Sequence, residues 1–288
     1  MTTFFERVLR SLASKMMRPF GFKIIETERL EALQSEIKLL EGEIASKNDP
    51  QSAIREARLR RVEQRKVDFI FGISPEFGTE ILTYFPNSYA QLYQDLFVLS
   101  ETGFKKDGYF VEFGATNGIS LSNTYLLEGE FGWSGILAEP ARPWHDALQS
   151  NRSAKVDFRC VWRETGEMLE FSESDVGEYS TLGAFAHLER HTKNRIVANR
   201  YDVPTVSLLD LLKDHNAPRL IDYLSIDTEG SELEILKAFD FDAYDIRIIT
   251  VEHNHTPDRK HIYKLLTAKG FVRKYEKLSK FDDWYVKP

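Results

Sequence analysis

Two short segments of the chain place carboxylates and a histidine directly after apolar, strand-like runs. Asp227 follows the run 221–226, and Glu252 and His253 end the run 246–251. Asp227 or His253 can serve as a general base that takes the proton of a hydroxyl group. Together with Glu252 they can instead hold a divalent cation, Mg²⁺ or Mn²⁺, which prefers oxygen-rich ligands. Asp227 and His253 are therefore candidate catalytic residues, and all three are candidate metal ligands.

A loop with the pattern E-x-G-x-x-x-G, residues 112–118, indicates a cofactor site. The dinucleotide pattern is G-x-G-x-x-G, and the carboxylate of Glu112 would repel the pyrophosphate of a dinucleotide. S-adenosylmethionine has no phosphate there and carries an ammonium group, which a carboxylate attracts. Gly114 and Gly118 permit the backbone to approach the sugar of the cofactor closely. Glu139, 21 residues beyond Gly118, can accept hydrogen bonds from both ribose hydroxyls.

The elements that must position these residues follow from the alternation of apolar runs and helical patterns. Seven segments have the pattern of strands: 108–114, 135–139, 155–161, 221–226, 246–251, 271–277 and 283–286. Helices are predicted between them over residues 122–130, 143–151, 208–215, 232–238 and 260–269. This order predicts an α/β fold with a Rossmann-like, seven-stranded, mostly parallel sheet and helices on both faces. Ligands of such sheets bind beyond the carboxyl ends of the strands, where the candidate residues fall.

Five blocks in this order resemble the FkbM-type methyltransferases: VEFGATNGISLSNT, GWSGILAEP, VPTVSLLDLL, IDYLSIDTEGSELEIL and VEHN. The resemblance covers residues 89–288. It implies S-adenosylmethionine as methyl donor and O-methylation of a hydroxyl, often on sugars of glycans or glycolipids or on natural products. The matching positions imply a donor site made of Glu112, Gly114, Ala115, Asn117, Gly118, Asn123, Glu139, Cys160 and Val161. Asn123 would touch the donor or only cap a helix. Cys160 and Val161 would border the adenine, unless Cys160 is only a small buried apolar side chain.

The partner of such an enzyme is a small-molecule or carbohydrate acceptor. Segment 161–202 is an insertion at the strand-end side of the sheet, where substrate contacts are common, and we expect it to recognise the acceptor. Two other functions compete with this interpretation. One is a nicotinamide-dependent oxidoreductase, against which Glu112 and the missing loop glycine argue. The other is a non-catalytic scaffold that binds the cofactor only.

Residues 1–66 lie outside the resemblance and have helical patterns. Residues 4–18 form a basic amphipathic pattern, which can pack on protein or lie in a membrane interface. Residues 27–47 carry apolar side chains three and four positions apart, as in a short coiled coil. These helices can form a homo-oligomer, as an antiparallel pair as readily as a parallel one, or pack onto another helix. We expect an N-terminal helical region over residues 1–66, a linker over 67–88 and a methyltransferase domain over 89–288.

The composition limits the partners and the compartment. Among 288 residues, 38 Lys and Arg face 45 Asp and Glu, which gives a formal net charge of −7 and argues against a nucleic-acid partner. The single cysteine, Cys160, excludes an intramolecular disulfide. The sequence has neither an apolar run of about 18 residues nor the pattern of a signal peptide. We therefore expect a cytoplasmic protein, peripheral to the membrane where residues 4–18 bind it.

Overall fold

The computed structural model describes residues 50–73, 78–174, 181–182 and 197–288. The predictions for residues 4–18 and 27–47 lie outside these ranges. The chain divides into two compact units, Met1–Glu63 and Gln64–Pro288. The first described helix is α3, Pro50–Gly72, and its residues in the first unit include an ion pair between Glu56 and Arg60, one helical turn apart. Within the described ranges, none of the helices combines the length and the apolarity that crossing a bilayer requires.

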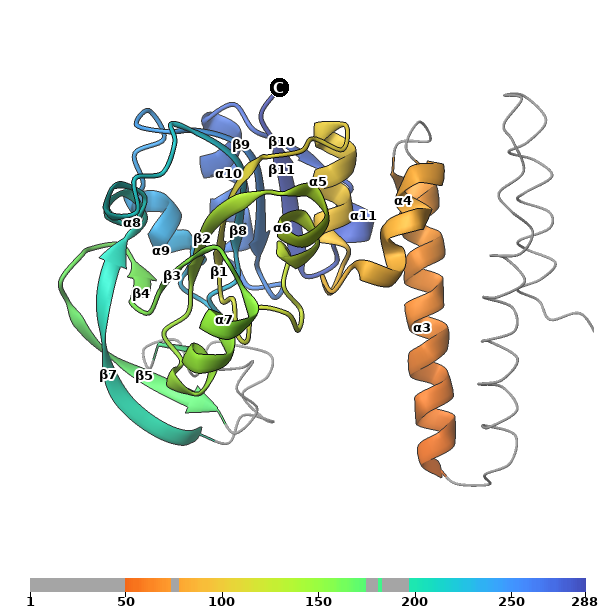
Figure 1. Ribbon diagram of the computed structural model, residues 1–288, viewed down its shortest axis with the longest axis horizontal. Coiled ribbons are helices and arrows are strands. Elements are labelled where there is room, and N and C mark those ends of the chain that lie inside the picture. The colour runs from red at the N-terminus through yellow and green to blue at the C-terminus, as the bar shows by residue number, and fades with distance from the viewer. Residues whose placement is uncertain (1–49, 74–77, 175–180, 183–196) are drawn as a thin grey trace, which may run out of the picture. The chain divides into compact units, whose positions relative to one another are not determined.

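The second unit is built on a seven-stranded sheet with the order β10-β11-β9-β8-β1-β2-β3 (Figure 1). Five strands are parallel: β1 Tyr109–Phe113, β2 Ser134–Ala138, β3 Lys155–Asp157, β8 Leu220–Ile226 and β9 Asp245–Glu252. The last two, β10 Val272–Lys274 and β11 Asp282–Val286, are antiparallel. The predicted α/β fold with a mostly parallel, seven-stranded sheet is confirmed.

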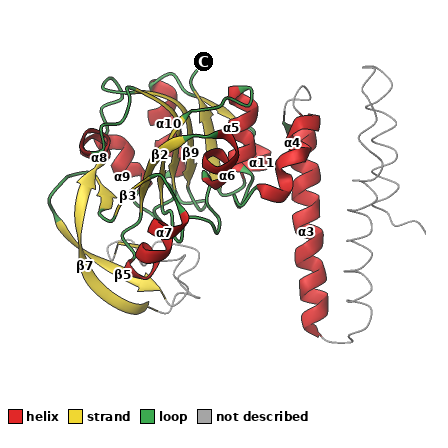
Figure 2. Cartoon of the chain, viewed as in Figure 1, coloured by secondary structure: helices red, strands yellow, loops and turns green. Residues whose placement is uncertain are grey.

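Helices cover both faces of this sheet (Figure 2). Alternate side chains of a strand point to opposite faces, so Phe110 and Val111 belong to two different apolar clusters. The Val111 cluster includes α8 Leu208–Asp214, α9 Glu232–Ala238 and α10 Arg259–Ala268. The Phe110 cluster includes α3, α4 Gly78–Tyr84, α5 Gln94–Thr102, α6 Tyr125–Phe131 and α7 His145–Asn151. The remaining short helices are η2 Phe85–Asn87, η3 Arg142–Trp144 and α11 Glu276–Ser279.

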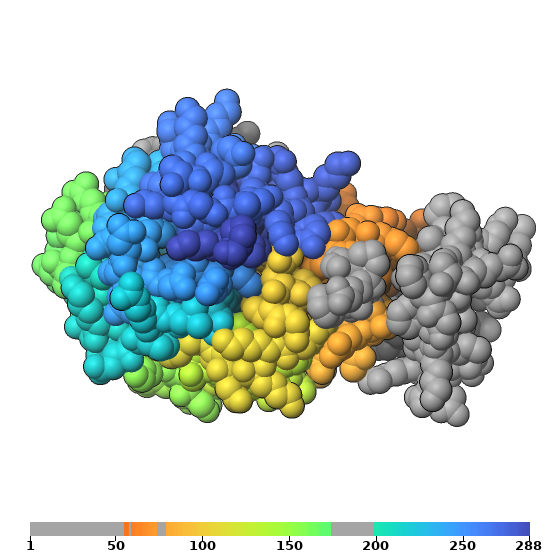
Figure 3. Space-filling model, turned by 90° about the horizontal axis from the view of Figure 1, so that it is seen from above, coloured from red at the N-terminus to blue at the C-terminus, as the bar shows by residue number. Residues whose placement is uncertain are grey.

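Segments far apart in the sequence lie side by side in this unit. Gln94 of α5 donates a buried hydrogen bond of 2.7 Å to Asp282 of β11, and Lys274 pairs with Glu101 at 2.6 Å. Figure 3 shows the corresponding surfaces, yellow and blue, in contact. The C-terminal strands therefore depend on α5 for part of their packing.

The predicted strand 155–161 is wrong as a single element. It ends at Asp157, and Cys160–Trp162 forms β4 of a second sheet with the order β4-β7-β5-β6. The break is local, because Arg159 donates its backbone N–H and its guanidinium to the carboxylate of Asp157. The rest of the insertion supplies β5 Met168–Ser174, β6 Thr181–Leu182 and β7 Val197–Ser207.

Two other element boundaries differ from the sequence pattern. The helix predicted over 122–130 begins only at Tyr125, because the Ser122 side chain and the Asn123 N–H bond the carboxylate of Glu112. The strand predicted over 271–277 ends at Lys274, since Tyr275 takes a left-handed conformation and starts α11.

The described part of the segment predicted as a linker, 67–88, is mostly helical. Phe69, Ile73, Ile81 and Phe85 of this segment are buried in the Phe110 cluster. These side chains thus contribute to the core of the second unit. The domain boundaries at residues 66 and 89 stay a prediction.

Candidate active site

A pocket opens at the carboxyl ends of the neighbouring strands β8, β1 and β2 and is bordered by the second sheet. A polar or flexible residue directly follows each of these strands, Asp227, Gly114 and Glu139, at the edge where parallel sheets bind their ligands. The side chains and backbone that line the pocket are Glu112, Phe113, Gly114, Thr116, Leu121, Asn123, Ala138, Glu139, Pro140, Cys160, Val161, Phe171, Asp227, Thr228 and Glu229.

Six of the nine predicted donor-site residues line this pocket: Glu112, Gly114, Asn123, Glu139, Cys160 and Val161. The other three lie nearby with structural roles. Ala115 is buried in the Phe110 cluster, and Asn117 accepts the N–H groups of the following turn. A Cβ atom on Gly118 would lie 2.6 Å from Cγ of Arg152, so this glycine makes room for a side chain of the protein itself.

Gly114 is required where β1 and β8 come together. Its φ of +75° is unfavourable for other residues, and a Cβ atom would lie 2.1 Å from the carbonyl oxygen of Asp227. The donor loop therefore leaves β1 directly against the backbone that carries the acceptor-side carboxylate. This contact places the two halves of the candidate site side by side.

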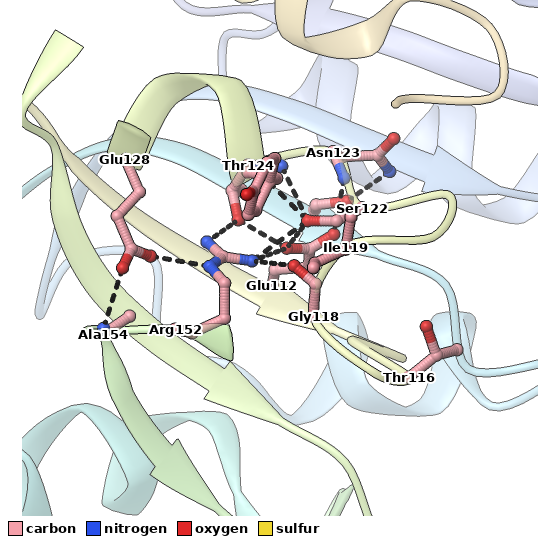
Figure 4. Close-up of polar contacts among 12 residues, drawn as sticks. Glu112, Thr116, Gly118, Ile119, Ser122, Asn123, Thr124, Glu128, Arg152 and Ala154 are labelled. Atoms are coloured by element: carbon pink, nitrogen blue, oxygen red, sulfur yellow. Dashed lines mark hydrogen bonds and ion pairs between the residues drawn. The ribbon is translucent and has the colours of Figure 1, made fainter. Parts of the chain in front are cut away.

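The carboxylate of Glu112 is engaged within the protein. It is 2% exposed and accepts hydrogen bonds from the Asn123 N–H at 2.7 Å, the Ser122 hydroxyl at 3.0 Å and the Thr124 hydroxyl (Figure 4). Nη1 of Arg152 lies 3.8 Å from the same group. Glu112 lines the pocket and, through these contacts, also braces the donor loop.

Asn123 lines the pocket and carries a buried hydrogen-bond acceptor. Its Nδ2 donates to the Ser225 hydroxyl at 2.9 Å, which fixes the amide, and its buried Oδ1 has no hydrogen-bond partner among the described residues. A buried acceptor without a partner is costly and fits a site completed by a ligand. An ammonium group, such as that of S-adenosylmethionine, supplies the missing donor.

Glu139 is held in place by its own backbone surroundings. Its two carboxylate oxygens accept the N–H groups of Thr116 and Ala141, each at 2.8 Å. Burial raises the pKa of the Glu139 carboxyl to about 7. A carboxylate fixed at the end of β2 has the position expected for a partner of the ribose hydroxyls.

Three carboxylates gather at the ends of β8 and β9. Asp227, Glu229 and Glu252 each offer an oxygen atom, and these atoms lie within 4.8 Å of one another. Burial raises the pKa of Glu252 well above its ordinary value, and the charges of Asp227 and Glu229 raise it further. The arrangement disfavours simultaneous ionisation of all three groups, so it attracts a proton or a cation.

His253 is placed differently from the sequence prediction. Its Nε2 donates to the carbonyl oxygen of Asp282 at 3.0 Å, and its Nδ1 accepts the N–H of His255 at 2.9 Å. The ring is buried and does not line the pocket, and burial lowers its pKa to about 4. The structure thus brings Asp227 and Glu252 together with Glu229, whereas His253 ties the end of β9 to β11. Its catalytic role stays a prediction.

Sequence reasoning missed several residues that line the pocket, among them Glu229 and Phe171. Glu229 lies in the same motif as Asp227, but the first turn of a helix explains an acid there equally well. Phe171 of β5 lines the pocket beside Cys160 and Val161. Its only signal was membership of the insertion 161–202, which the sequence assigned to the acceptor rather than to the donor side.

The buried carboxyls predict how stability depends on pH. Burial raises the pKa of Asp95, Glu139 and Glu232 to about 7 and that of Asp282 to about 8, from ordinary values of 3.8 to 4.5. The folded chain binds more protons than the unfolded chain between these values, so the free energy of unfolding falls as pH rises through this window. The lowered pKa of His253 contributes to the pH dependence of the free energy of unfolding with the opposite sign, and only below about pH 6.5.

We therefore expect the melting temperature to be at least about 5 °C lower at pH 8 than at pH 6.5. Thermal unfolding followed by circular dichroism in EDTA measures this, because a bound cation would mask the repulsion. A melting temperature that rises between the two pH values would contradict the assignment of raised pKa values to these carboxyls.

Comparison with solved structures finds proteins to which the chain is similar. The chain is similar to a Precorrin-6y C5,15-methyltransferase from Geobacter metallireducens GS-15, with 12% identity, 67% of this chain and 85% of that chain covered, and a TM-score of 0.35. It is also similar to a chain of a fibrillarin/Nop5p complex, with 14% identity, 62% and 71% covered, and a TM-score of 0.30. No curated protein matches the chain.

The assignment depends on a family model, the Methyltransferase FkbM domain, which matches residues 112–273. The match covers more than half of the chain and runs from Glu112 through the Asp227 and Glu252 segments to β10. It favours methyl transfer over the nicotinamide-dependent alternative. The chain belongs to the FkbM methyltransferase family and is an S-adenosylmethionine-dependent methyltransferase.

Proposed function

We propose that the protein transfers a methyl group from S-adenosylmethionine to a hydroxyl group of a carbohydrate-containing acceptor. The observation that carries the proposal is the position of Asp227, which lines the donor pocket and also belongs to the carboxylate group at the ends of β8 and β9. A methyl transfer to a hydroxyl requires an aligned oxygen and a group that removes or weakens its proton. Asp227 lies where both needs meet.

The donor side fits S-adenosylmethionine in three parts. Glu139 would accept hydrogen bonds from the ribose hydroxyls, and Oδ1 of Asn123 would accept one from the ammonium. Cys160, Val161 and Phe171 give the pocket an apolar wall that suits an adenine ring. The cofactor supplies an electrophilic methyl group on a sulfonium. The residues of the chain bind it, orient it and exclude water.

The acceptor side favours a polyhydroxylated molecule. Carboxylates are hydrogen-bond acceptors only, so Asp227 and Glu229 are matched to hydroxyl donors. The FkbM resemblance supports a sugar of a glycan, a glycolipid or a natural product. Asp227 can take the proton of the reacting hydroxyl itself, or share a cation that lowers the pKa of that hydroxyl.

The proposal is tested in two steps. Calorimetric titration with S-adenosylhomocysteine establishes the donor site, and a dissociation constant in the micromolar range is expected. Candidate glycans and glycolipids are then incubated with S-adenosylmethionine and analysed by mass spectrometry for the gain of one methyl group. Methylation confined to amine or carboxylate positions would overturn the hydroxyl assignment while leaving the donor site intact.

A cation held by Asp227, Glu229 and Glu252 is the second element of the proposal, and it replaces the set that includes His253. Removing divalent cations with EDTA should lower turnover at least about tenfold, and Mg²⁺ or Mn²⁺ should restore it. Mn²⁺ should also raise the melting temperature of the wild type but not of Glu252→Gln. Full activity in EDTA would mean that Asp227 acts as a base without a metal.

A further inference from the structure

Arg152, which follows α7, lies under the donor loop without reaching the pocket. Its side chain is 1% exposed, and its N–H groups are distributed over four partners (Figure 4). Nε donates to Glu128 at 2.7 Å, Nη1 to the Gly118 carbonyl at 3.0 Å and to the Ser122 hydroxyl at 3.1 Å, and Nη2 to the Thr124 hydroxyl at 2.8 Å. Only a planar fork of donors can serve all four at once.

The partners of Arg152 are the residues that shape the donor loop. Ser122 and Thr124 flank Asn123 on both sides, and both hydroxyls also donate to the carboxylate of Glu112. The side chain of Arg152 fills the space that a Cβ of Gly118 would occupy. Arg152 on one side and Glu112 on the other therefore hold the same stretch of backbone.

The hydrogen bonds of Arg152 and Glu112 to the residues on both sides of Asn123 hold the Asn123 side chain in one orientation. The N–H of Asn123 is bonded to Glu112 and its Nδ2 to Ser225, whereas its buried Oδ1 has no hydrogen-bond partner among the described residues, and the residue lines the pocket. A shift of the flanking residues would rotate the amide away from this arrangement. Since hydrogen bonds lose strength steeply with misalignment, a small displacement is enough to lose the acceptor.

We propose that Arg152 is a positioning residue for the methyl donor, which holds the donor loop so that Oδ1 of Asn123 meets the ammonium group of S-adenosylmethionine. The inference rests on the proposed function, because it takes the pocket to be the donor site. The inference gives a reason for the buried position of Arg152, whose side chain can reach the loop because residue 118 is a glycine.

The test compares two probes that share the adenosine part. S-adenosylhomocysteine carries the amino acid ammonium, whereas 5′-methylthioadenosine lacks it. In Arg152→Lys, which keeps the charge and loses the fork, we expect the dissociation constant of S-adenosylhomocysteine to rise at least about tenfold and that of 5′-methylthioadenosine to change less than about threefold. If Arg152 only stabilised the fold, the substitution would weaken the binding of both probes to the same extent.

Two further variants control the measurement. Ser122→Ala removes one hydroxyl shared by Arg152 and Glu112. It should raise the dissociation constant of S-adenosylhomocysteine by about three- to tenfold and leave that of 5′-methylthioadenosine unchanged. Asp222→Asn disrupts a partly buried ion pair with Lys105 at the opposite end of β8, and it should lower the melting temperature without changing either dissociation constant.

The outcomes separate the inference from the function on which it rests. If the wild type binds neither probe, the proposed donor site is wrong. If the wild type binds both probes and Arg152→Lys weakens the binding of neither probe, or of both probes equally, the positioning role is wrong. Should Arg152→Lys fail to fold, the dissociation constants of the two probes are compared in Ser122→Ala instead, and the same outcomes apply.

Discussion

Asp227→Asn should lower the turnover number at least about a hundredfold, the usual scale for the loss of a general base. The substitution keeps the size of the side chain and removes the charge that either a base or a cation ligand needs. The affinity for S-adenosylhomocysteine should change less than about threefold, because the donor is held mainly by Glu139 and the loop. Initial rates on an acceptor confirmed by mass spectrometry measure the first quantity, and calorimetry measures the second.

A matched control shows whether the effect belongs to the site. Glu234 lies on α9, exposed and paired with Lys237, so Glu234→Gln removes the same charge outside the pocket and should leave turnover unchanged. Full activity of Asp227→Asn would show that the acceptor side is assigned wrongly, and the donor site would survive that result. Full activity of His253→Ala would be consistent with a histidine whose ring nitrogens hydrogen-bond to the backbone and whose Nε2 lies 3.7 Å from the Asp283 carboxylate.

Glu139→Ala should weaken the binding of S-adenosylhomocysteine by about 2–3 kcal/mol, or about 30- to 150-fold, because hydrogen bonds to a charged acceptor are among the stronger ones. The change also leaves the N–H groups of Thr116 and Ala141 without their partner, so some loss of stability is expected. Titration calorimetry gives the dissociation constant, and thermal unfolding gives the stability.

Glu232 offers a control for the general effect of losing a buried acid. Its pKa is likewise raised to about 7 by burial, and it accepts backbone N–H groups of the loop before α9, but it does not line the pocket. Glu232→Ala should therefore lower the melting temperature and leave the affinity for S-adenosylhomocysteine unchanged. An unchanged dissociation constant in Glu139→Ala would place Glu139 outside the donor site.

The acidic character of the acceptor side predicts that stability depends on pH differently in Asp227→Asn and in the wild type. Asp227 contributes to the raised pKa values of Glu139, Glu232, Glu252 and Asp282, after the larger effect of burial. Neutralising Asp227 lowers the cost of ionising its neighbours. The fall in stability between pH 6.5 and pH 8 should therefore be smaller in Asp227→Asn than in the wild type.

The sequence alone determined the order of the strands along the chain, the parallel sheet and the strand ends that carry the chemistry. Glu112, Glu139 and Asp227, which the sequence singled out, line one pocket, and their roles there stay predictions. The physical reason is local, because burial patterns with periods of two and 3.6 residues are written in neighbouring residues. The parallel arrangement then brings the strand ends to one edge.

Only the tertiary structure decided which side chains meet at that edge. It turned His253 toward β11, added Glu229 to the carboxylates, and brought Phe171 from a second sheet whose existence the continuous run 155–161 concealed. It also revealed that a Cβ atom on Gly118 would meet the side chain of Arg152. Each of these contacts depends on side-chain direction and on packing between residues far apart in the chain, and neither is encoded in the spacing of a motif.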